Sequence, residues 1–316
     1  MRIVFMGTGE IGLPTLDWLI ATPKHEVVAV VTQPDKPVGR KQILTPPETK
    51  VHAIQAGIPV LQPDRLRHHA DELRAFKADV FVVVAYGQIL SQAVLDIPLQ
   101  GCLNIHTSLL PKYRGAAPIQ AAIREGDAES GVTIMFMDAG LDTGDILLQD
   151  AFTLAPDETG GSLHDKLAER APAALEQALD LIATGQPPRA PQNESQATHI
   201  GKLTRTDGRI DWSKTSTEID CLIRSYTPWP GTFTTLKLGD QPKQLKIHRA
   251  KDQPDAEVCP TPGTIVSADN DGILVACGQG TLRLTEVQIE GGKGLSAADF
   301  LRGHAVEVGS ILGSTP

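Results

Sequence analysis

The sequence predicts an α/β fold in which a doubly wound parallel sheet is followed by a smaller β-barrel. Short apolar strands alternate with helical patterns through the first half, and residues 80–86 are apolar throughout. The last third contains several short strands close together in the sequence. Continuous apolar strands between helices are typical of a parallel sheet covered on both faces. A chain of 316 residues has room for two domains, since a domain holds roughly 100–200 residues.

The elements of the first domain follow from apolar runs and helical periodicity. Strands are expected at Arg2–Met6, Glu26–Thr32, Pro59–Leu61, Val80–Tyr86, Leu103–His106, Val132–Met137 and Asp145–Phe152. Helices are expected from Gly12 to Ile20 and at Val51–Ala56, Ala70–Phe76, Pro118–Glu125 and Ser162–Ala183. Ser162 is expected to cap the last of these helices.

The pattern changes after residue 185. Residues 186–206 hold prolines, amides and hydroxyls with little apolar periodicity, which indicates a linker. One helix and several short strands follow, at Ile219–Ser225, Thr232–Leu238, Leu245–Ala250, Gly263–Ser267, Gly272–Ala276 and Leu282–Ile289. Short strands at this spacing predict a small barrel. The expected division is therefore a domain at 1–185, a linker at 186–206 and a second domain at 207–316.

Composition excludes several classes of protein. Hydrophobic residues make up 41% and charged residues 21% of the chain, as in an ordinary globular protein. No apolar run approaches the ~20 residues of a membrane-spanning helix, and the amino terminus does not read as a secretory signal. We expect a cytoplasmic protein without a metal site, because its cysteines are widely spaced at Cys102, Cys221, Cys259 and Cys277.

Residues Gly7–Gly12 read G-T-G-E-I-G, follow a predicted strand and open a predicted helix. They match the dinucleotide fingerprint of Rossmann-like domains, which also expects an acidic residue about 20 positions later at the end of the second strand. Here that strand ends in Val-Thr-Gln-Pro, and Asp35 falls in the loop beyond. A glycine turn that packs helix against strand explains the pattern better, and a nicotinamide-dependent dehydrogenase stays an alternative.

An amide and an imidazole, Asn104 and His106, stand two residues apart in a predicted strand. Residues two apart in a strand face the same side, and open α/β sheets bind ligands at the carboxyl ends of their strands. Together the two side chains can donate hydrogen bonds to an oxygen that gains negative charge. The alternative is a hydrogen-bonded polar pair at a strand end.

The residues that follow resemble the folate-dependent formyltransferases. His106 is followed by SLLPKYRGAAPIQ at 108–120 and later by LDTGDI at 141–146. That family combines an Asn and a His two apart with S-L-L-P, an Arg-Gly and a downstream Asp in a D-x-G-x-I-like loop. All of these elements are present in order. The family usually has Pro and Phe where Gly9 and Ile11 stand in this sequence.

The resemblance implies that an acceptor amine attacks the formyl carbon of 10-formyltetrahydrofolate, with no metal involved. Asn104 would donate to the oxyanion, and protonated His106 would donate to it or to the leaving folate nitrogen. Asp142 would orient His106 and raise its pKa, or take the amine proton through a water. Of the flanking carboxylates, Asp138 suits a role in shaping the folate pocket and Asp145 a turn or cap role.

Two segments resemble the folate-binding segments of the family. Residues 84–90 (VAYGQIL) resemble the loop whose backbone holds the pterin ring, and S-L-L-P matches a second folate segment. For Arg114–Gly115, a structural role in the loop and a ligand contact both stay open. The implied folate-binding residues are Tyr86, Gly87, Gln88, Ile89, Leu90, Ser108, Leu109, Leu110 and Pro111.

Residues 33–50 form a long polar loop with four basic and two acidic residues. Loops longer than about 12–15 residues are uncommon unless they are functional or disordered, although a solvated loop is the alternative. The loop resembles the one that family members acting on methionyl initiator tRNA insert at the acceptor stem. The implied tRNA contacts are Pro37, Gly39, Arg40 and Lys41.

A second basic stretch spans residues 237–251, with five basic residues and one acidic residue. Apolar and basic or polar residues alternate over Leu245–Arg249, so one face of this strand is expected to be basic. The second domain resembles the OB-like barrel of the tRNA-acting members, and such barrels commonly bind nucleic acid. A solvated face is the alternative to a phosphate-binding track, which would consist of Lys202, Arg205, Lys243, Lys246 and Arg249.

The resemblance favours a monomeric enzyme that formylates methionyl initiator tRNA and releases tetrahydrofolate. A formyltransferase acting on an amino sugar nucleotide would share Asn104, His106 and Asp142 and differ in its acceptor. A non-catalytic RNA-binding protein stays a third possibility, because the basic segments alone do not require a reaction.

Overall fold

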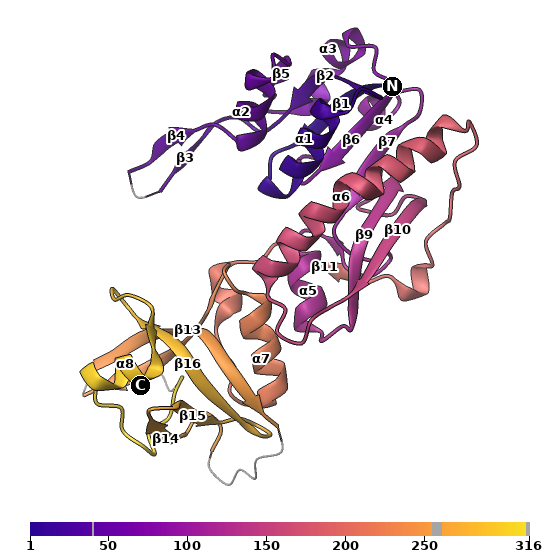
Figure 1. Cartoon of the computed structure of the whole chain (residues 1–316). Helices are drawn as coiled ribbons and strands as arrows, with labels where there is room; N and C mark the ends of the chain where they lie inside the picture. Colours follow the sequence, from indigo (N-terminus) through magenta and orange to yellow (C-terminus); the bar gives the residue numbers. More distant parts are fainter. Residues whose placement is uncertain (40, 240, 255–260, 314–316) are drawn as a thin grey trace. The chain divides into compact units, whose positions relative to one another are not determined.

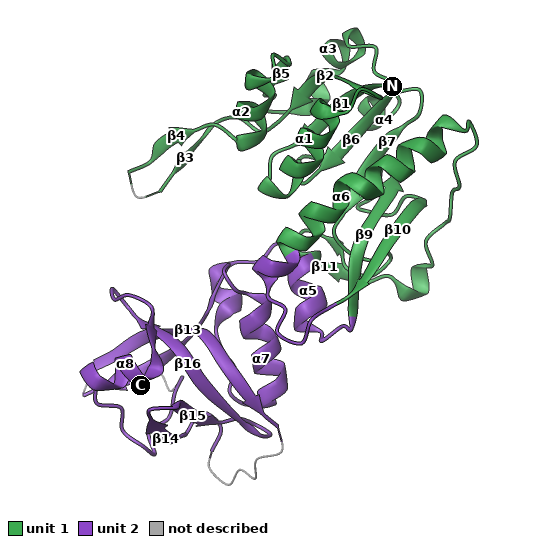
Figure 2. Ribbon diagram, in the orientation of Figure 1, with its two compact units in different colours: residues 1–118, 129–153, 164–200 green, residues 119–128, 154–163, 201–316 purple. Residues whose placement is uncertain are grey.

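The computed structural model describes residues 1–39, 41–239, 241–254 and 261–313. The predicted contact residue Arg40 and the cysteine Cys259 lie outside these ranges. The chain forms two compact units (Figure 2). Unit 1 comprises Met1–Pro118, Glu129–Thr153 and His164–Ile200, and unit 2 comprises Ile119–Ala128, Leu154–Leu163 and Gly201–Pro316. The division predicted from the sequence, into domains at 1–185 and 207–316 with a linker at 186–206, stays a prediction.

Unit 1 is built on a seven-stranded sheet in the order β10-β9-β7-β6-β1-β2-β5 (Figure 1). The first five strands in chain order are parallel, and the last two are antiparallel to their neighbours. The α/β fold predicted from the sequence is confirmed. The strands are β1 (Arg2–Gly7), β2 (Glu26–Val31), β5 (Val60–Leu61), β6 (Val80–Val84), β7 (Cys102–His106), β9 (Glu129–Phe136) and β10 (Ile146–Thr153).

The central strands of this sheet are buried on both faces. Every residue of β6 is buried, and in β1 all residues after Arg2 are buried. Burying one such apolar side chain contributes about 1.5–3 kcal/mol. Since neither face meets water, the strands show continuous apolar runs rather than alternation.

Helices and short turns connect these strands. Thr159 caps α6, because its Oγ1 accepts a hydrogen bond from the Ser162 backbone N–H at 3.1 Å. The prediction that Ser162 is the cap is wrong, since the helix begins two residues before it. The helical segments are η1 (Glu10–Gly12), α1 (Leu13–Ala21), α2 (Glu48–Gln55), η2 (Leu66–His68), α3 (Ala70–Ala75), α4 (Gln92–Leu95), α5 (Pro118–Arg124) and α6 (Gly160–Ala183).

The polar loop predicted at 33–50 contains a β-hairpin of β3 (Lys36–Val38) and β4 (Ile43–Thr45). The hairpin projects from the rest of unit 1 (Figure 1). Its base is held by Asp35, whose carboxylate accepts hydrogen bonds from Lys50 Nζ at 2.8 and 2.9 Å and from Gln62 Nε2 at 2.7 Å.

The segment predicted as a linker returns to unit 1 over residues 190–200. Ala190 and Ile146 exchange backbone hydrogen bonds of 2.9 and 3.0 Å. A 3₁₀ turn, η3 (Glu194–Gln196), follows, and β11 (His199–Ile200) pairs in parallel with β8 (Arg114–Gly115). Gly115 has a φ of 111°, and a Cβ there would lie 2.3 Å from the Ile200 carbonyl oxygen. Only glycine therefore allows β11 to approach this closely.

Unit 2 contains an antiparallel sheet in the order β12-β13-β16-β15-β14, with β17 paired to β16. In β13 the side chains of Leu245 and Ile247 are buried while Lys246 is exposed, so the predicted alternation is present. The elements are η4 (Arg205–Gly208), α7 (Ser216–Ser225), β12 (Thr232–Leu238), β13 (Gln241–Gln253), β14 (Ile265–Asp269), β15 (Gly272–Ala276), β16 (Thr281–Ile289), β17 (Leu295–Ser296) and α8 (Ala297–Gly303).

The inner face of this sheet and one face of α7 form the core of unit 2. Ile219 and Ile223, four residues apart on α7, pack in this core with Trp212 and Phe300. Among the described residues, none of the helices of the chain combines the length and apolar character needed to cross a lipid bilayer.

Candidate active site

Asn104, His106 and Asp142 lie together at the carboxyl end of β7. Asn104 Nδ2 donates a hydrogen bond to Asp142 Oδ1 at 3.2 Å, and His106 Nδ1 lies 3.7 Å from Asp142 Oδ2. The two residues of β7 share a face because strand side chains alternate. Asp142 comes from the loop between β9 and β10, and β9 is the antiparallel neighbour of β7.

The imidazole of His106 is buried, with 5% of the residue exposed. Its Nε2 donates to the carbonyl oxygen of Tyr113 at 3.0 Å, so Nε2 carries a proton and Nδ1 faces Asp142. Burial lowers the pKa of His106, and this outweighs the Asp142 carboxylate and the Tyr113 carbonyl, which raise it. The predicted effect of Asp142, which raises this pKa, is confirmed, and the net decrease comes from desolvation of the charged ring.

Asp142 has a φ of 56°, in the left-handed region of backbone conformation. Such a residue costs about 1–3 kcal/mol and persists only where its surroundings hold it. Its carboxylate accepts from Asn104 and, through Oδ2, from the Gly115 backbone N–H at 2.8 Å. Its carbonyl oxygen accepts from Gln192 Nε2 at 2.8 Å. The carboxylate is thus presented to the site in a fixed orientation.

The neighbouring carboxylates have other contacts. Asp138 Oδ1 accepts from the Gly140 N–H at 2.9 Å and from Thr143 Oγ1 at 2.7 Å, so it shapes the loop that carries Asp142. The carboxylate of Asp145 lies 3.9 Å from Arg189 Nη1. This ion pair is a structural contact, and the turn or cap role expected of Asp145 stays a prediction.

The sequence left open whether Arg114 has a structural role or contacts a ligand, and in the structure its side chain makes structural contacts. Its side chain is only 1% exposed. The guanidinium binds both carboxylate oxygens of Glu194, at 2.7 and 3.0 Å, and Oε1 of Gln192, at 2.9 and 3.0 Å. Sequence reasoning missed Gln192 and Glu194, because an amide and a carboxylate in a polar, Pro-rich segment give no signal of a specific contact.

The predicted folate segment Ser108–Pro111 is largely enclosed. Ser108 Oγ donates to the Lys112 carbonyl oxygen at 2.6 Å, and Thr133 Oγ1 donates to the Ser108 carbonyl oxygen at 2.6 Å. Ser108 and Leu110 are buried, while Leu109 and Pro111 are partly exposed. The loop after β7 is therefore fixed by its own polar groups and by β9.

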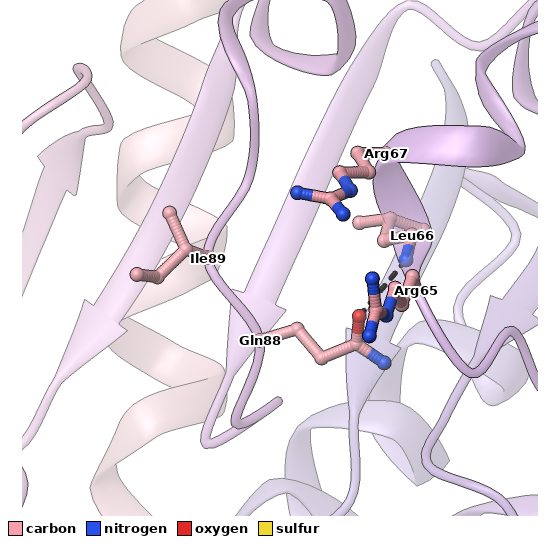
Figure 3. Close-up of a pocket in the computed structure, with 5 residues that line it drawn as sticks. All are labelled: Arg65, Leu66, Arg67, Gln88 and Ile89. Atoms are coloured by element: carbon pink, nitrogen blue, oxygen red, sulfur yellow. Dashed lines mark hydrogen bonds between the residues drawn. The ribbon is translucent and has the colours of Figure 1, made fainter.

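A cavity of about 250 Å³ lies beside the other predicted folate segment, Tyr86–Leu90. Figure 3 shows Arg65, Leu66 and Arg67 along one side and Gln88 and Ile89 along the other. The Gln88 side chain accepts from the Leu66 N–H at 2.9 Å and donates to the Pro63 carbonyl oxygen at 2.9 Å. Tyr86 and Leu90 instead pack in the core, and burial raises the pKa of Tyr86 to about 12.

The predicted tRNA-contact residues occur in two sets. Gly39 and Lys41 are exposed on the hairpin together with Pro37. The other set is exposed on unit 2, where the Nε of Arg249 lies 3.6 Å from Glu286 Oε2. This second set consists of Lys202, Arg205, Lys243, Lys246 and Arg249.

The glycines that match the dinucleotide fingerprint lie against other atoms of unit 1. A Cβ on Gly7 would lie 2.7 Å from the Phe5 ring, and a Cβ on Gly12 would lie 3.2 Å from it. These contacts are what a glycine turn between strand and helix predicts.

Comparison with known proteins gives the class. The family model described as formyl transferase matches residues 1–179, and the model described as formyl transferase, C-terminal domain, matches residues 202–305. The chain belongs to the formyltransferase family. Within it, the chain is 48% identical over 308 residues to the methionyl-tRNA formyltransferase of Marinobacter nauticus, covering 96% of each. It is 46% identical over 315 residues to the methionyl-tRNA formyltransferase of Geobacter metallireducens, covering 99% of each.

Solved structures of the same fold are more distant in sequence. An N-formyltransferase from Helicobacter canadensis, in complex with folinic acid and dTDP-3-aminofucose, aligns with a TM-score of 0.67 at 18% identity, covering 90% of this chain and 99% of that one. HypX from Aquifex aeolicus, in complex with tetrahydrofolic acid, aligns with a TM-score of 0.61 at 18% identity, covering 95% of this chain and 47% of that one. At this identity the likeness is one of fold.

Proposed function

We propose that the protein transfers the formyl group of 10-formyltetrahydrofolate to the free amino group of methionyl initiator tRNA. The products are formylmethionyl-tRNA, used to initiate translation, and tetrahydrofolate. The observation that carries the proposal is the cluster of Asn104, His106 and Asp142 in a chain whose full-length relatives carry the name of this activity. The enzyme acts as a monomer in the cytoplasm.

In the proposed reaction the amine attacks the formyl carbon, and the oxygen of the formyl group becomes an oxyanion. The amide of Asn104 has two N–H donors, of which one binds Asp142 and the other is available to the oxyanion. Loss of one such donor typically costs ~100- to 1,000-fold in kcat.

Proton movements in this reaction balance without a co-reactant. The attacking amine gives up a proton as the new C–N bond forms, and the folate nitrogen gains one as the old C–N bond breaks. Because burial lowers the pKa of His106, its ring is neutral at pH 7 and its Nδ1 can accept the proton, directly or through a water held by Asp142. The protonated ring then donates to the leaving nitrogen.

The surface around the cavity suits the cofactor. Folates carry carboxylates on their glutamate part, and the guanidiniums of Arg65 and Arg67 line the cavity beside Gln88 and Ile89.

The hairpin of β3 and β4 supplies a different kind of surface. Val38, Ile43 and Leu44 are 56%, 61% and 65% exposed, beside basic residues that can contact phosphates.

One assay tests the reaction and the acceptor. Two parallel reactions contain the protein and labelled 10-formyltetrahydrofolate. One has methionyl initiator tRNA as the acceptor, and the other has an amino sugar nucleotide. We expect label in the tRNA only, together with salt-sensitive tRNA binding at micromolar protein. Label in the sugar nucleotide, or tight binding of NADH in a fluorescence titration, would overturn the proposal. Sedimentation tests whether the protein is a monomer.

A further inference from the structure

We propose that three residues of the segment 192–198, namely Gln192, Glu194 and Thr198, position groups of the active site, and that Gln192 fixes the backbone of the loop that carries Asp142. The inference rests on the proposed function and adds to it a positioning residue that lies 50 residues after Asp142 in the sequence. It follows from a continuous set of contacts within unit 1.

Both the nitrogen and the oxygen of the Gln192 side-chain amide make hydrogen bonds. Its Nε2 donates to the carbonyl oxygens of Asp142 and Gly144, both at 2.8 Å. Its Oε1 accepts two hydrogen bonds from Arg114. An exchange of the amide nitrogen and oxygen would place donors against donors, so these partners determine the orientation of the amide. Gln192 therefore clamps the backbone on both sides of Thr143.

The loop requires such a clamp. Asp142 is in the left-handed region at a φ of 56°, and an L-residue leaves that region when its hydrogen bonds are lost. Gly144 lies close against the neighbouring strand, because a Cβ there would clash with the Phe136 carbonyl oxygen. Release of the two carbonyls allows the Asp142 carboxylate to turn away from His106 and Asn104.

Arg114 and Glu194 hold Gln192 in place. A buried guanidinium needs a charged partner, because an unpaired charge in the interior is strongly destabilising. Glu194 provides that partner although its own side chain is 73% exposed. The contacts thus run from Glu194 through Arg114 and Gln192 to Asp142.

The same segment also reaches the acceptor of His106. Thr198 Oγ1 accepts from the Tyr113 N–H at 2.8 Å, and the Thr198 carbonyl accepts from the Arg114 N–H at 2.9 Å. Tyr113 has a φ of 63°, and its carbonyl oxygen accepts from His106 Nε2. Both partners that orient the imidazole are therefore held by this segment, Asp142 by Gln192 and Tyr113 by Thr198.

The test is a double-mutant cycle on formyl transfer with Gln192→Ala, Asp142→Asn and the double variant. Because an error of about 1 Å in a catalytic group can cost ~100-fold, we expect Gln192→Ala to lower kcat by ~10- to 100-fold. The KM for 10-formyltetrahydrofolate should stay within about twofold, because this lesion is one of orientation. In the Asp142→Asn background, Gln192→Ala should have no further effect.

Gln196→Ala is the matched control, because it removes an exposed glutamine from the turn η3, four residues after Gln192, and should leave kcat unchanged. Gln192→Glu separates the two sides of the amide, since it keeps the acceptor for Arg114 and loses the donors, and it should be as impaired as Gln192→Ala. Unchanged kcat in Gln192→Ala, or losses that multiply in the double variant, would overturn the proposal.

A second measurement does not depend on activity. Hydrogen exchange of peptides that span residues 137–146 should be faster in Gln192→Ala than in Gln196→Ala, and equal exchange would overturn the positioning role. If the wild-type protein transfers no formyl group to any acceptor, the proposed function fails, while the exchange measurement still decides whether Gln192 holds the loop.

Discussion

At the residue scale, the site combines groups that a sequence pattern can find with groups that it cannot. Asn104 and His106 were predictable because the alternation of a strand puts both on one face. Asp142 was found only through the resemblance, since nothing in its local pattern distinguishes it from Asp138 or Asp145. Gln192 was not predictable, because its contacts depend on the path of a chain segment without regular structure.

The first prediction concerns the oxyanion. Asn104→Ala should lower kcat for formyl transfer by ~100- to 1,000-fold, because it removes a donor from the developing negative charge. Steady-state kinetics with saturating substrates measures the loss. Binding of initiator tRNA should be unchanged, and a loss of less than about tenfold would mean that another group stabilises the oxyanion.

The second prediction follows from the direction of the His106 pKa shift. Because burial lowers this pKa below its ordinary value of 6.5, the unfolded chain binds a proton at a higher pH than the folded one. The contribution of His106 to stability is therefore present above pH 6.5 and is lost as the pH falls from there towards the lowered pKa. Urea unfolding at pH 7.5 and 5.5 measures this loss in the wild type.

His106→Gln is the comparison for that experiment, because glutamine does not titrate. The variant should lose less stability than the wild type between the two pH values. An equal loss in both proteins would show that other groups account for the acid sensitivity.

At the element scale, sequence patterns predicted buried strands well and exposed short ones poorly. Strands β1, β6 and β7 were predicted because both of their faces are packed. The hairpin of β3 and β4 was predicted as a loop, because three-residue strands with exposed side chains leave neither an apolar run nor alternation. Strands β8 and β11 have two residues each, and their pairing depends on tertiary contacts alone.

The third prediction concerns the hairpin. Replacing residues 36–45 by a short Gly-Ser turn should abolish productive use of tRNA and leave folate binding intact, because the hairpin lies outside the sheet and is held at its base by Asp35 and Lys50. Formyl transfer and titration with 5-formyltetrahydrofolate measure the two properties. The point variant Arg40→Ala should also weaken productive use of tRNA and leave folate binding intact, and a loss of folate binding would indicate that the hairpin is structural.

The fourth prediction concerns α7, whose first turn has a capping box. Thr215 Oγ1 accepts from the Glu218 N–H at 3.1 Å, and the Glu218 carboxylate accepts from the Thr215 N–H at 2.9 Å. Thr215→Ala should lower the free energy of unfolding by about 1 kcal/mol, measured by urea denaturation. Thr215→Ser keeps the hydroxyl and is the control, and an equal loss in both variants would exclude the cap as the cause.

At the scale of the whole molecule, the total charge is a poor guide to the partner. The chain has a formal net charge of -9, which by itself argues against a nucleic-acid ligand. The exposed basic residues of β13 give this strand a local positive charge despite the negative total, and a polyanion responds to local charge. Composition therefore indicated only an ordinary globular protein, and local patterns were needed to suggest the kind of partner.

The fifth prediction is a salt dependence. If Lys243 and Lys246 contact phosphates, Lys243→Ala and Lys246→Ala together should weaken tRNA binding and lower the slope of log K against log salt by about 1–2. Filter binding over a range of salt concentrations measures the slope. Lys293→Ala removes an exposed lysine outside the predicted track, and an equal change in this control would show that only total charge matters.

The return of residues 199–200 to pair with residues 114–115 has a consequence for biosynthesis. A nascent chain that has emerged as far as residue 185 already contains every strand of the large sheet, yet it lacks the amide that clamps the Asp142 backbone. Such a fragment should therefore transfer the formyl group more slowly than the complete chain. On the proposed role of Gln192, translation must continue from Thr153, where the last strand of the sheet ends, through the whole of α6 before the site is complete.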